Sequence, residues 1–218
     1  MSFANAEGKC ILLAMINAIC KNRDRLSEID GLIGDGDHGV NMNKGFSIFE
    51  RQIREKDISF SDGLEQLGMI LMNEIGGSMG PIYGSIFMEM ADASSEAERI
   101  DAAKLLQMLE AAQNALYEII DARTGDKTLV DTLSPAIEAL RNSVFAGEDF
   151  PTALEKMRKA AQAGCYSTKD MVAKYGRSAR LGARSIGVLD AGAASCCLIL
   201  SAMCDGIETL LRKGDDML

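Results

Sequence analysis

The sequence lacks several features on which other classes of protein depend. Its 218 residues contain no tryptophan, three prolines and a single histidine, His38, and none of the six cysteines forms a C-x-x-C pair. A zinc site is therefore not expected, because such sites draw on several histidines or on paired cysteines. The cysteines lie in apolar sequence, and we interpret them as small core residues of a protein in the reducing cytoplasm.

Basic residues are also scarce. Lysine and arginine number 23 against 32 aspartates and glutamates, which gives a formal net charge of −9. Nucleic acid and membranes are therefore not expected as partners, since nucleic acid and anionic membrane surfaces attract basic proteins. The longest uncharged stretch of the C-terminal third, Ala191 to Cys204, contains glycine and serine and is too short to cross a bilayer, so no transmembrane helix is expected.

The alternating pattern typical of β-strands is missing as well. No run of β-branched or aromatic residues bounded by turn signals occurs, so a sheet is not expected. Apolar residues instead recur every three or four positions through most of the chain, first in the stripe Ile11, Leu12, Met15, Ile16 and Ile19. We predict an all-α protein that forms one domain over residues 1–218, with about eight helices joined by short loops.

Several residues are candidates to begin or bend these helices. Ser61 and Asp101 are predicted to cap the helices that follow them, and Pro151 to occupy a first turn. Pro135 lies within an apolar stripe and is expected to bend its helix by removing one backbone hydrogen bond. A well-buried final helix is predicted from about Ala191 to Leu211.

Glycine is abundant, and its distribution is uneven. Fourteen of the 21 glycines fall in four places, namely residues 31–45, residues 76–84, position 125 and residues 176–192. Glycines gathered in this way indicate backbone that must approach something closely.

The first cluster reads D-G-L-I-G-D-G-D-H-G-V-N-M from Asp30. Its glycines match G-x-G-x-x-G, but a dinucleotide loop offers bare amides to pyrophosphate, whereas the aspartates here would repel it. A divalent cation between the aspartates and a phosphate removes that conflict, and Asp30, Asp35 and Asp37 supply the oxygen ligands that Mg²⁺ prefers. The acids do not follow the calcium spacing of an EF-hand, and a solvated acidic turn before a helix is the structural alternative.

The other glycine clusters are candidates to bind an anion, and each could instead have a purely structural role. Residues 76–84 either aim free N–H groups at an anion or form a flexible helix junction. The run G-D-K-T from Gly125 resembles the end of a Walker A loop without its spacing, and a capped helix start is the alternative. Arg177, Arg180 and Arg184 lie beside four glycines and suit phosphate, unless they are solvated surface residues.

Four motifs follow one another along the chain: G-D-G-D-H-G-x-N-M, G-G-x-x-G-P-x-Y-G, G-D-K-T-L-x-D and G-R-x-A-x-L-G-x-R-S-I-G-x-x-D-x-G-A. Together they resemble the nucleotide-binding L subunit of dihydroxyacetone kinases, from about Leu26 to Leu198. The resemblance implies an eight-helix antiparallel up-and-down barrel with the nucleotide at one end. It also implies that Asp30, Asp35 and Asp37 hold two Mg²⁺ ions that bridge the phosphates of ADP or ATP.

Further nucleotide contacts are implied by the same resemblance. They carry over to His38, Gly39, Val40, Asn41, Met79, Gly80, Leu129, Arg177, Asp190, Ala191 and Gly192. Three of these positions depart from the family pattern, because Met79 replaces a small hydroxyl residue, Leu129 a frequent methionine and Ala191 a proline. The departures affect the expected adenine pocket and leave the three aspartates intact.

The resemblance further implies that the chain presents the phosphoryl donor in a kinase that acts only with a separate K subunit, which holds dihydroxyacetone. In some members a phosphotransferase-system M subunit is a further partner and bound ADP carries the phosphate; a phosphohistidine at His38 is the alternative relay. The sequence leaves open a donor subunit for a four-carbon ketose or another substrate, and a non-enzymatic ligand-binding or regulatory helical module. The three neighbouring aspartates argue against a non-enzymatic module, because unpaired carboxylates held close together repel one another and would serve no purpose there.

Overall fold

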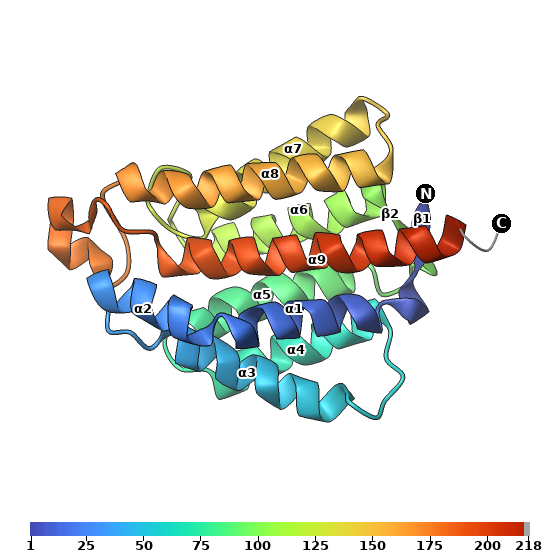
Figure 1. Cartoon of the computed structure of the whole chain (residues 1–218), viewed down its shortest axis with the longest axis horizontal. Coiled ribbons are helices and arrows are strands. Elements are labelled where there is room, and N and C mark those ends of the chain that lie inside the picture. Colours follow the sequence, from blue (N-terminus) through green and yellow to red (C-terminus); the bar gives the residue numbers. More distant parts are fainter. Residues whose placement is uncertain (216–218) are drawn as a thin grey trace.

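The computed structural model describes residues 1–215, with side chains to residue 213, and confirms the all-α fold. The described residues form nine α-helices: α1 (Lys9–Lys21), α2 (Arg23–Ile33), α3 (His38–Ile53), α4 (Phe60–Glu74), α5 (Met79–Asp92), α6 (Ala102–Ile119), α7 (Val130–Phe145), α8 (Phe150–Ser167) and α9 (Ala191–Asp215). Short 3-10 segments occupy Asn5–Glu7 (η1), Thr168–Asp170 (η2) and Ser178–Ser185 (η3). Only Asn22 separates α1 from α2, so these two helices follow one another along one side of the molecule (Figure 1).

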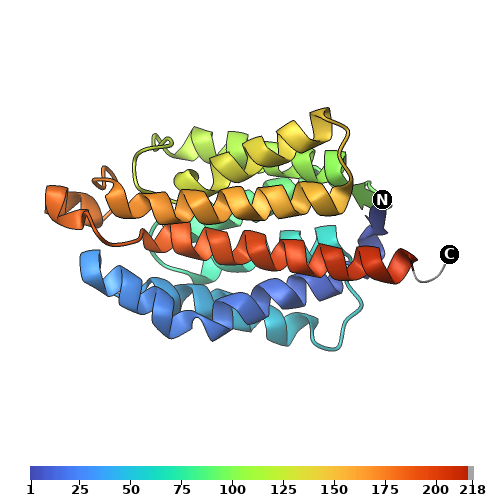
Figure 2. The same cartoon turned by 45° about the horizontal axis from the view of Figure 1, so that its top comes forward.

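The helices form a closed barrel. Each helix from α3 to α9 packs against the one before it, and α9 packs against α1, which closes the ring. With α1 and α2 taken together, eight antiparallel helical segments surround an apolar core that includes Phe46, Phe49 and Phe87. Figures 1 and 2 show these segments running side by side along the long axis.

The antiparallel order decides where the connections lie. The links that follow α2, α4, α6 and α8 gather at one end of the barrel, which is the left end in Figure 1. These links contain the glycine-rich segments that the sequence singled out. The same end therefore receives the N-termini of α3, α5, α7 and α9, whose first backbone N–H groups have no partner within their own helix.

Most of the expected helix starts are confirmed. The Asp101 carboxylate accepts a hydrogen bond from the Lys104 N–H, and Pro151 lies in the first turn of α8. Pro135 lies inside α7, as expected. Ser61 was predicted wrongly as a cap: Ser59 caps α4 by accepting from the Asp62 N–H, whereas Ser61 is buried and hydrogen-bonds to Asn5.

The expectation that no sheet forms is also corrected. Ser2–Ala4 (β1) pairs antiparallel with Arg99–Asp101 (β2), with Phe3 opposite Ile100. Strands of three residues are too short to show an alternating pattern, so they could not be predicted from the sequence. Both Phe3 and Ile100 are buried, and the pair covers the end of the barrel opposite the glycine-rich links.

Helix α9 is longer than the uncharged stretch suggested. Its part from Ala191 to Lys213 has the length and apolar composition of a membrane span, with a mean hydropathy of 1.5, which corrects the expectation that this segment is too short. However, 67% of the apolar window of this helix is buried inside the molecule, where α9 packs against α1, α7 and α8. Packing in the barrel accounts for its apolar side chains. The six cysteines are free thiols, three of them buried and three half-buried.

Candidate functional site

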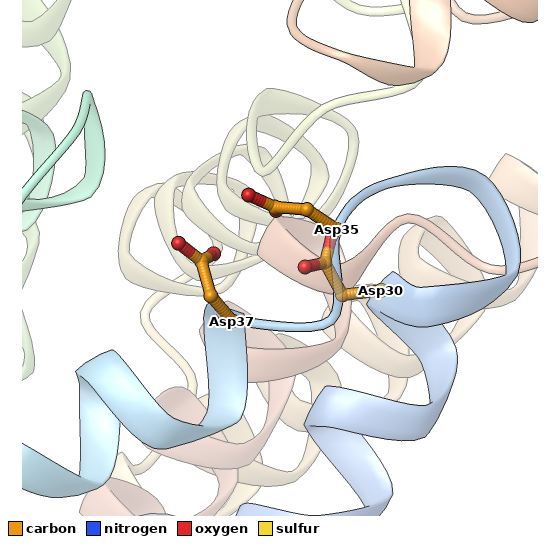
Figure 3. Close-up of side chains that lie close together, drawn as sticks. All are labelled: Asp30, Asp35 and Asp37. Atoms are coloured by element: carbon orange, nitrogen blue, oxygen red, sulfur yellow. The ribbon is translucent and has the colours of Figure 1, made fainter.

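Three aspartates come together where α2 ends and α3 begins. Asp30 lies in the last turn of α2, Asp35 in the connecting loop and Asp37 directly before α3, and their carboxylates face one another (Figure 3). One oxygen from each lies within 4.8 Å of the others. Gly36 takes a φ of +76°, a conformation that other residues rarely adopt, so the loop can turn back sharply enough to bring the aspartates together.

The cluster concentrates negative charge. Partial burial raises the pKa of Asp37, and the neighbouring carboxylates of Asp35 and Asp30 raise it further. The Asp37 carboxylate does not cap α3 although it stands at the capping position, so its oxygens are available to a ligand. Three carboxylates gathered this closely offer the oxygen ligands that a hard divalent cation prefers.

Arg177 reaches the cluster from a distant part of the chain. Its Nη2 lies 2.8 Å from Oδ2 of Asp35, although its side chain is 64% exposed. Among the described residues Arg180 and Arg184 make no ion pair, so the interpretation as surface arginines fits these two. The segment between α8 and α9 thus places one guanidinium beside the aspartates.

Gly39 serves a purpose that the sequence analysis did not foresee. A Cβ at this position would lie 1.9 Å from the carbonyl oxygen of Arg23, so only glycine lets α2 and α3 cross this closely. Gly80 is similar, with a Cβ 2.7 Å from the Ile75 carbonyl oxygen. Close approach of backbone to backbone is thus one reason for glycine at both positions, beside the nucleotide contact that was expected of them.

The imidazole of His38 points into the barrel. Its Nε2 lies 2.8 Å from Oγ of Ser195 on α9, and the Tyr83 hydroxyl on α5 lies 2.7 Å from the same Oγ. Burial lowers the pKa of His38 to about 4, so the ring is neutral at pH 7. The backbone N–H of His38 donates to Oδ2 of Asp30 over 3.3 Å, which joins this network to the acidic cluster.

The start of α9 closes another side of the site. The Asp190 carboxylate caps the helix by accepting from the Ala193 N–H over 2.7 Å, and burial raises the pKa of Asp190 to about 6. The Tyr83 hydroxyl donates to the Gly192 carbonyl, and a Cβ on Gly192 would lie 3.6 Å from Leu129 before α7. Asp190, Ala191, Gly192 and Leu129 are therefore neighbours.

The other residues of the expected nucleotide site lie in first turns at the same barrel end. Val40 is 46% exposed and Asn41 half-buried on α3, and Met79 is half-buried at the start of α5. Ser195 on α9 and Tyr83 on α5 also belong to this end of the barrel, and neither was predicted from the sequence. A serine inside a helical stripe gives no sign of a histidine 157 residues away.

The G-D-K-T segment is held by a side chain of α7. The Asp131 carboxylate accepts from the backbone N–H groups of Gly125 and Thr128, so the segment leads into α7 in an ordered way, although Leu129 at the capping position provides no side-chain cap. Lys127 is only 1% exposed and donates to backbone carbonyls. Its ammonium group therefore does not face the acidic cluster as a Walker A lysine faces phosphate.

The helical barrel gathers an acidic cluster, an arginine and four helix N-termini at one end, an arrangement that suits a class of proteins that bind phosphate through a divalent cation. The comparisons agree: the DAK2 domain matches residues 32–205, and the chain belongs to this family. The resemblance read from the four motifs is thereby confirmed.

Two relatives match over most of their length. The "PEP-dependent dihydroxyacetone kinase, ADP-binding subunit DhaL" of Escherichia coli is 39% identical over 173 residues, which cover 78% of this chain and 81% of the relative. The "PEP-dependent dihydroxyacetone kinase 1, ADP-binding subunit DhaL" of Listeria innocua is 36% identical over 184 residues, covering 84% and 87%. The crystal structure of the dihydroxyacetone kinase from C. freundii in complex with AMP-PNP and Mg²⁺ has the same fold, with a TM-score of 0.70, 21% identity, and 94% of this chain and 34% of that chain covered.

Proposed function

We propose that this chain binds ADP or ATP with Mg²⁺ and presents a phosphoryl group to a small ketose, dihydroxyacetone, held on a separate K subunit. The observation that carries the proposal is the acidic cluster of Asp30, Asp35 and Asp37 at the end of the barrel where four helices begin. Such an arrangement suits a phosphate only with a divalent cation between phosphate and carboxylates. The relatives named as ADP-binding subunits and the structure with AMP-PNP and Mg²⁺ support the same interpretation.

The residues present fit magnesium. Carboxylate oxygens are hard ligands, and Asp30, Asp35 and Asp37 offer them without a histidine or thiol in the cluster. We propose that these three aspartates hold two ions between them. When bound, Mg²⁺ neutralises charge on the phosphate oxygens and orients the transferred group for in-line attack.

The chain's own groups would bind the rest of the nucleotide. The N-termini of α3, α5, α7 and α9 carry partial positive charge, which favours phosphate. These N-termini contain most of the residues that the resemblance assigns to the nucleotide: His38, Gly39, Val40, Asn41, Met79, Gly80, Ala191 and Gly192, with Leu129 and Asp190 directly before two of the helices. Arg177, which already lies at the cluster, adds a fixed fork of donors.

His38 has a defined part in this proposal. Ser195 engages Nε2, so Nδ1 is the ring nitrogen that remains for contact with a phosphate. We assign His38 to contact with phosphate rather than to a phosphohistidine relay, because its ring is buried and held from inside the barrel. An acid-labile phosphoryl group on His38 would contradict this assignment.

The proposal is tested by reconstitution. The purified chain is mixed with ATP, Mg²⁺ and dihydroxyacetone, with and without a K subunit, and dihydroxyacetone phosphate is measured. We expect turnover only when both subunits are present; efficient kinase activity of the single chain would contradict the proposal. Repeating the assay with phosphoenolpyruvate and a phosphotransferase-system M subunit in place of ATP separates the two donor systems. Bound ADP that stays on the chain through purification favours the carrier role.

In the proposed kinase, the K subunit determines which substrate is phosphorylated. A four-carbon ketose kinase would use the same donor site, so the assay includes erythrulose with the matching K subunit. If erythrulose is phosphorylated and dihydroxyacetone is not, the proposed substrate is wrong, but the proposed role of this chain as phosphoryl donor still holds. No binding of Mg²⁺ and ADP at all would favour a regulatory helical module.

A further inference from the structure

Lys127 combines two features that each cost stability. Among the described residues it is the one non-glycine residue with a positive φ, +61°, and its side chain is 1% exposed. A left-handed backbone is unfavourable for a residue with a Cβ, and a buried ammonium group needs partners. Such a combination persists only where the surrounding structure determines it.

The partners of the ammonium group are backbone carbonyls from two separate places. Nζ of Lys127 donates to the carbonyl oxygens of Thr168, where α8 ends, and of Val188, shortly before α9 begins. These two carbonyls bracket residues 169–187, the segment that contains the rest of η2 after Thr168, all of η3, and Arg177. One side chain from the α6–α7 link therefore holds both ends of this segment.

Other contacts extend the same connection. The Thr168 hydroxyl accepts from the Asp190 N–H over 3.1 Å, which ties the end of α8 to the start of α9. Burial lowers the pKa of Lys127, while the nearby carboxylates of Asp190, Asp170 and Asp131 act in the opposite direction. The ammonium group thus also balances charge at the start of α9.

We propose that Lys127 is a positioning residue that holds residues 169–187 against the barrel and so places Arg177 and Asp190 beside the acidic cluster. Its link to nucleotide binding rests on the proposed function. The link to the segment itself depends only on the hydrogen bonds to Thr168 and Val188.

The test compares Lys127→Met with the matched control Lys174→Met in the full-length, nucleotide-free chain. Lys174 also joins this segment to the α6–α7 link, through Asp126, but its side chain is 62% exposed. Backbone amide hydrogen exchange should become about tenfold faster within 169–187 in Lys127→Met, which corresponds to ~1.4 kcal/mol, while α4 and α5 keep their protection. Lys174→Met should change exchange there by less than about threefold. Unchanged exchange in a folded Lys127→Met would overturn the proposal.

Two further measurements separate the ammonium group from the backbone. Lys127→Gly relieves the positive φ and removes the side chain, so it should have a higher Tm than Lys127→Met and the same fast exchange in 169–187. Protection retained in Lys127→Gly would overturn the proposal. In the wild-type chain, the ¹⁵N ammonium resonance of Lys127 should exchange slowly with water and show couplings to the carbonyls of Thr168 and Val188. Their absence would overturn the proposal even if Lys127→Met did not fold.

The effect on ligand is measured last, by titration of ADP in the presence of Mg²⁺. We expect ADP to bind about tenfold more weakly to Lys127→Met than to Lys174→Met, because Arg177 is no longer held in place. A wild-type chain that bound no ADP would contradict the proposed function, while the exchange result would still decide the role of Lys127.

Discussion

The Nε2 atom of His38 lies 2.8 Å from Oγ of Ser195, so the first residue of α3 is joined to α9 from inside the barrel. The Tyr83 hydroxyl shares the same Oγ and adds α5. Because His38 directly follows Asp37, this network fixes the end of α3 that carries the third carboxylate of the cluster. The position of the acidic cluster therefore depends on three helices rather than on its loop alone.

Removing the Ser195 hydroxyl should weaken this end of the barrel. Ser195→Ala leaves the buried Nε2 of His38 without a partner, and we expect the free energy of unfolding to fall by about 1–3 kcal/mol. Tyr83→Phe should cost less, since Ser195 still reaches His38. Urea unfolding measures both, with Ser95→Ala as the control because Ser95 is exposed. A Ser195→Ala variant as stable as Ser95→Ala would contradict the structural role of the network.

Arg177 should affect metal and nucleotide in opposite directions. Its guanidinium lies beside Asp35, so Arg177→Leu leaves the acidic cluster more negative and should tighten binding of Mg²⁺ alone. The same change removes a phosphate donor and should weaken binding of ADP with Mg²⁺ about tenfold. Calorimetric titrations test both, and exposed Arg184→Leu should change neither. Parallel changes in the two affinities would contradict the assignment.

The crossing of α2 and α3 should tolerate no side chain at Gly39. A Cβ there would lie 1.9 Å from the Arg23 carbonyl oxygen, so Gly39→Ala must push the helices apart, at a cost of about 1–3 kcal/mol or more. A Cβ on Gly76 would have no heavy atom within 4 Å, so Gly76→Ala should be neutral or stabilise by about 0.4–1 kcal/mol. Thermal unfolding of the two variants gives the comparison, and equal Tm values would show that the crossing can relax.

Asp190 should give a distinct pH dependence. Burial raises its pKa in the folded chain to about 6, above its ordinary value of 3.8, so the folded state takes up a proton first and this group adds stability as the pH falls from 6 towards 4. Asp190→Asn should lose that gain. The Thr152 N–H lowers the pKa of Asp149, so the ionised carboxylate adds stability above pH 4 and loses it as the pH falls further, which makes Asp149→Asn a control of opposite sign: it should be less stable than wild type at pH 7 and 5, with a difference that shrinks only from about pH 4 downwards. Urea unfolding at pH 7, 5 and 4 checks both signs.

Periodicity and the four motifs were enough to predict the helical barrel and the position of the acidic cluster. A helix can be predicted from the spacing of apolar residues that are close in the sequence. The antiparallel order of the helices then brings every second link to the same end of the barrel. Partners far apart in the chain could not be predicted: nothing near His38 points to Ser195, and nothing near Lys127 points to Thr168. The choice of Ser59 over Ser61 as a cap depended on a buried contact with Asn5. The close crossing of α2 and α3 at Gly39 could not be predicted either, because a glycine required by helix packing and a glycine required by a ligand look alike in a sequence.

Titration of ADP in Mg²⁺ and in EDTA shows whether Asp30, Asp35 and Asp37 bind nucleotide through Mg²⁺. We expect wild-type chain to bind ADP in Mg²⁺, Asp37→Asn to weaken that binding by at least about tenfold, and EDTA to abolish it. Asp24→Asn, which changes an aspartate whose side chain is 96% exposed on the same helix as Asp30, should bind as wild type does. Equal ADP affinity in Mg²⁺ and EDTA, or an Asp37→Asn variant that binds like Asp24→Asn, would contradict the claim.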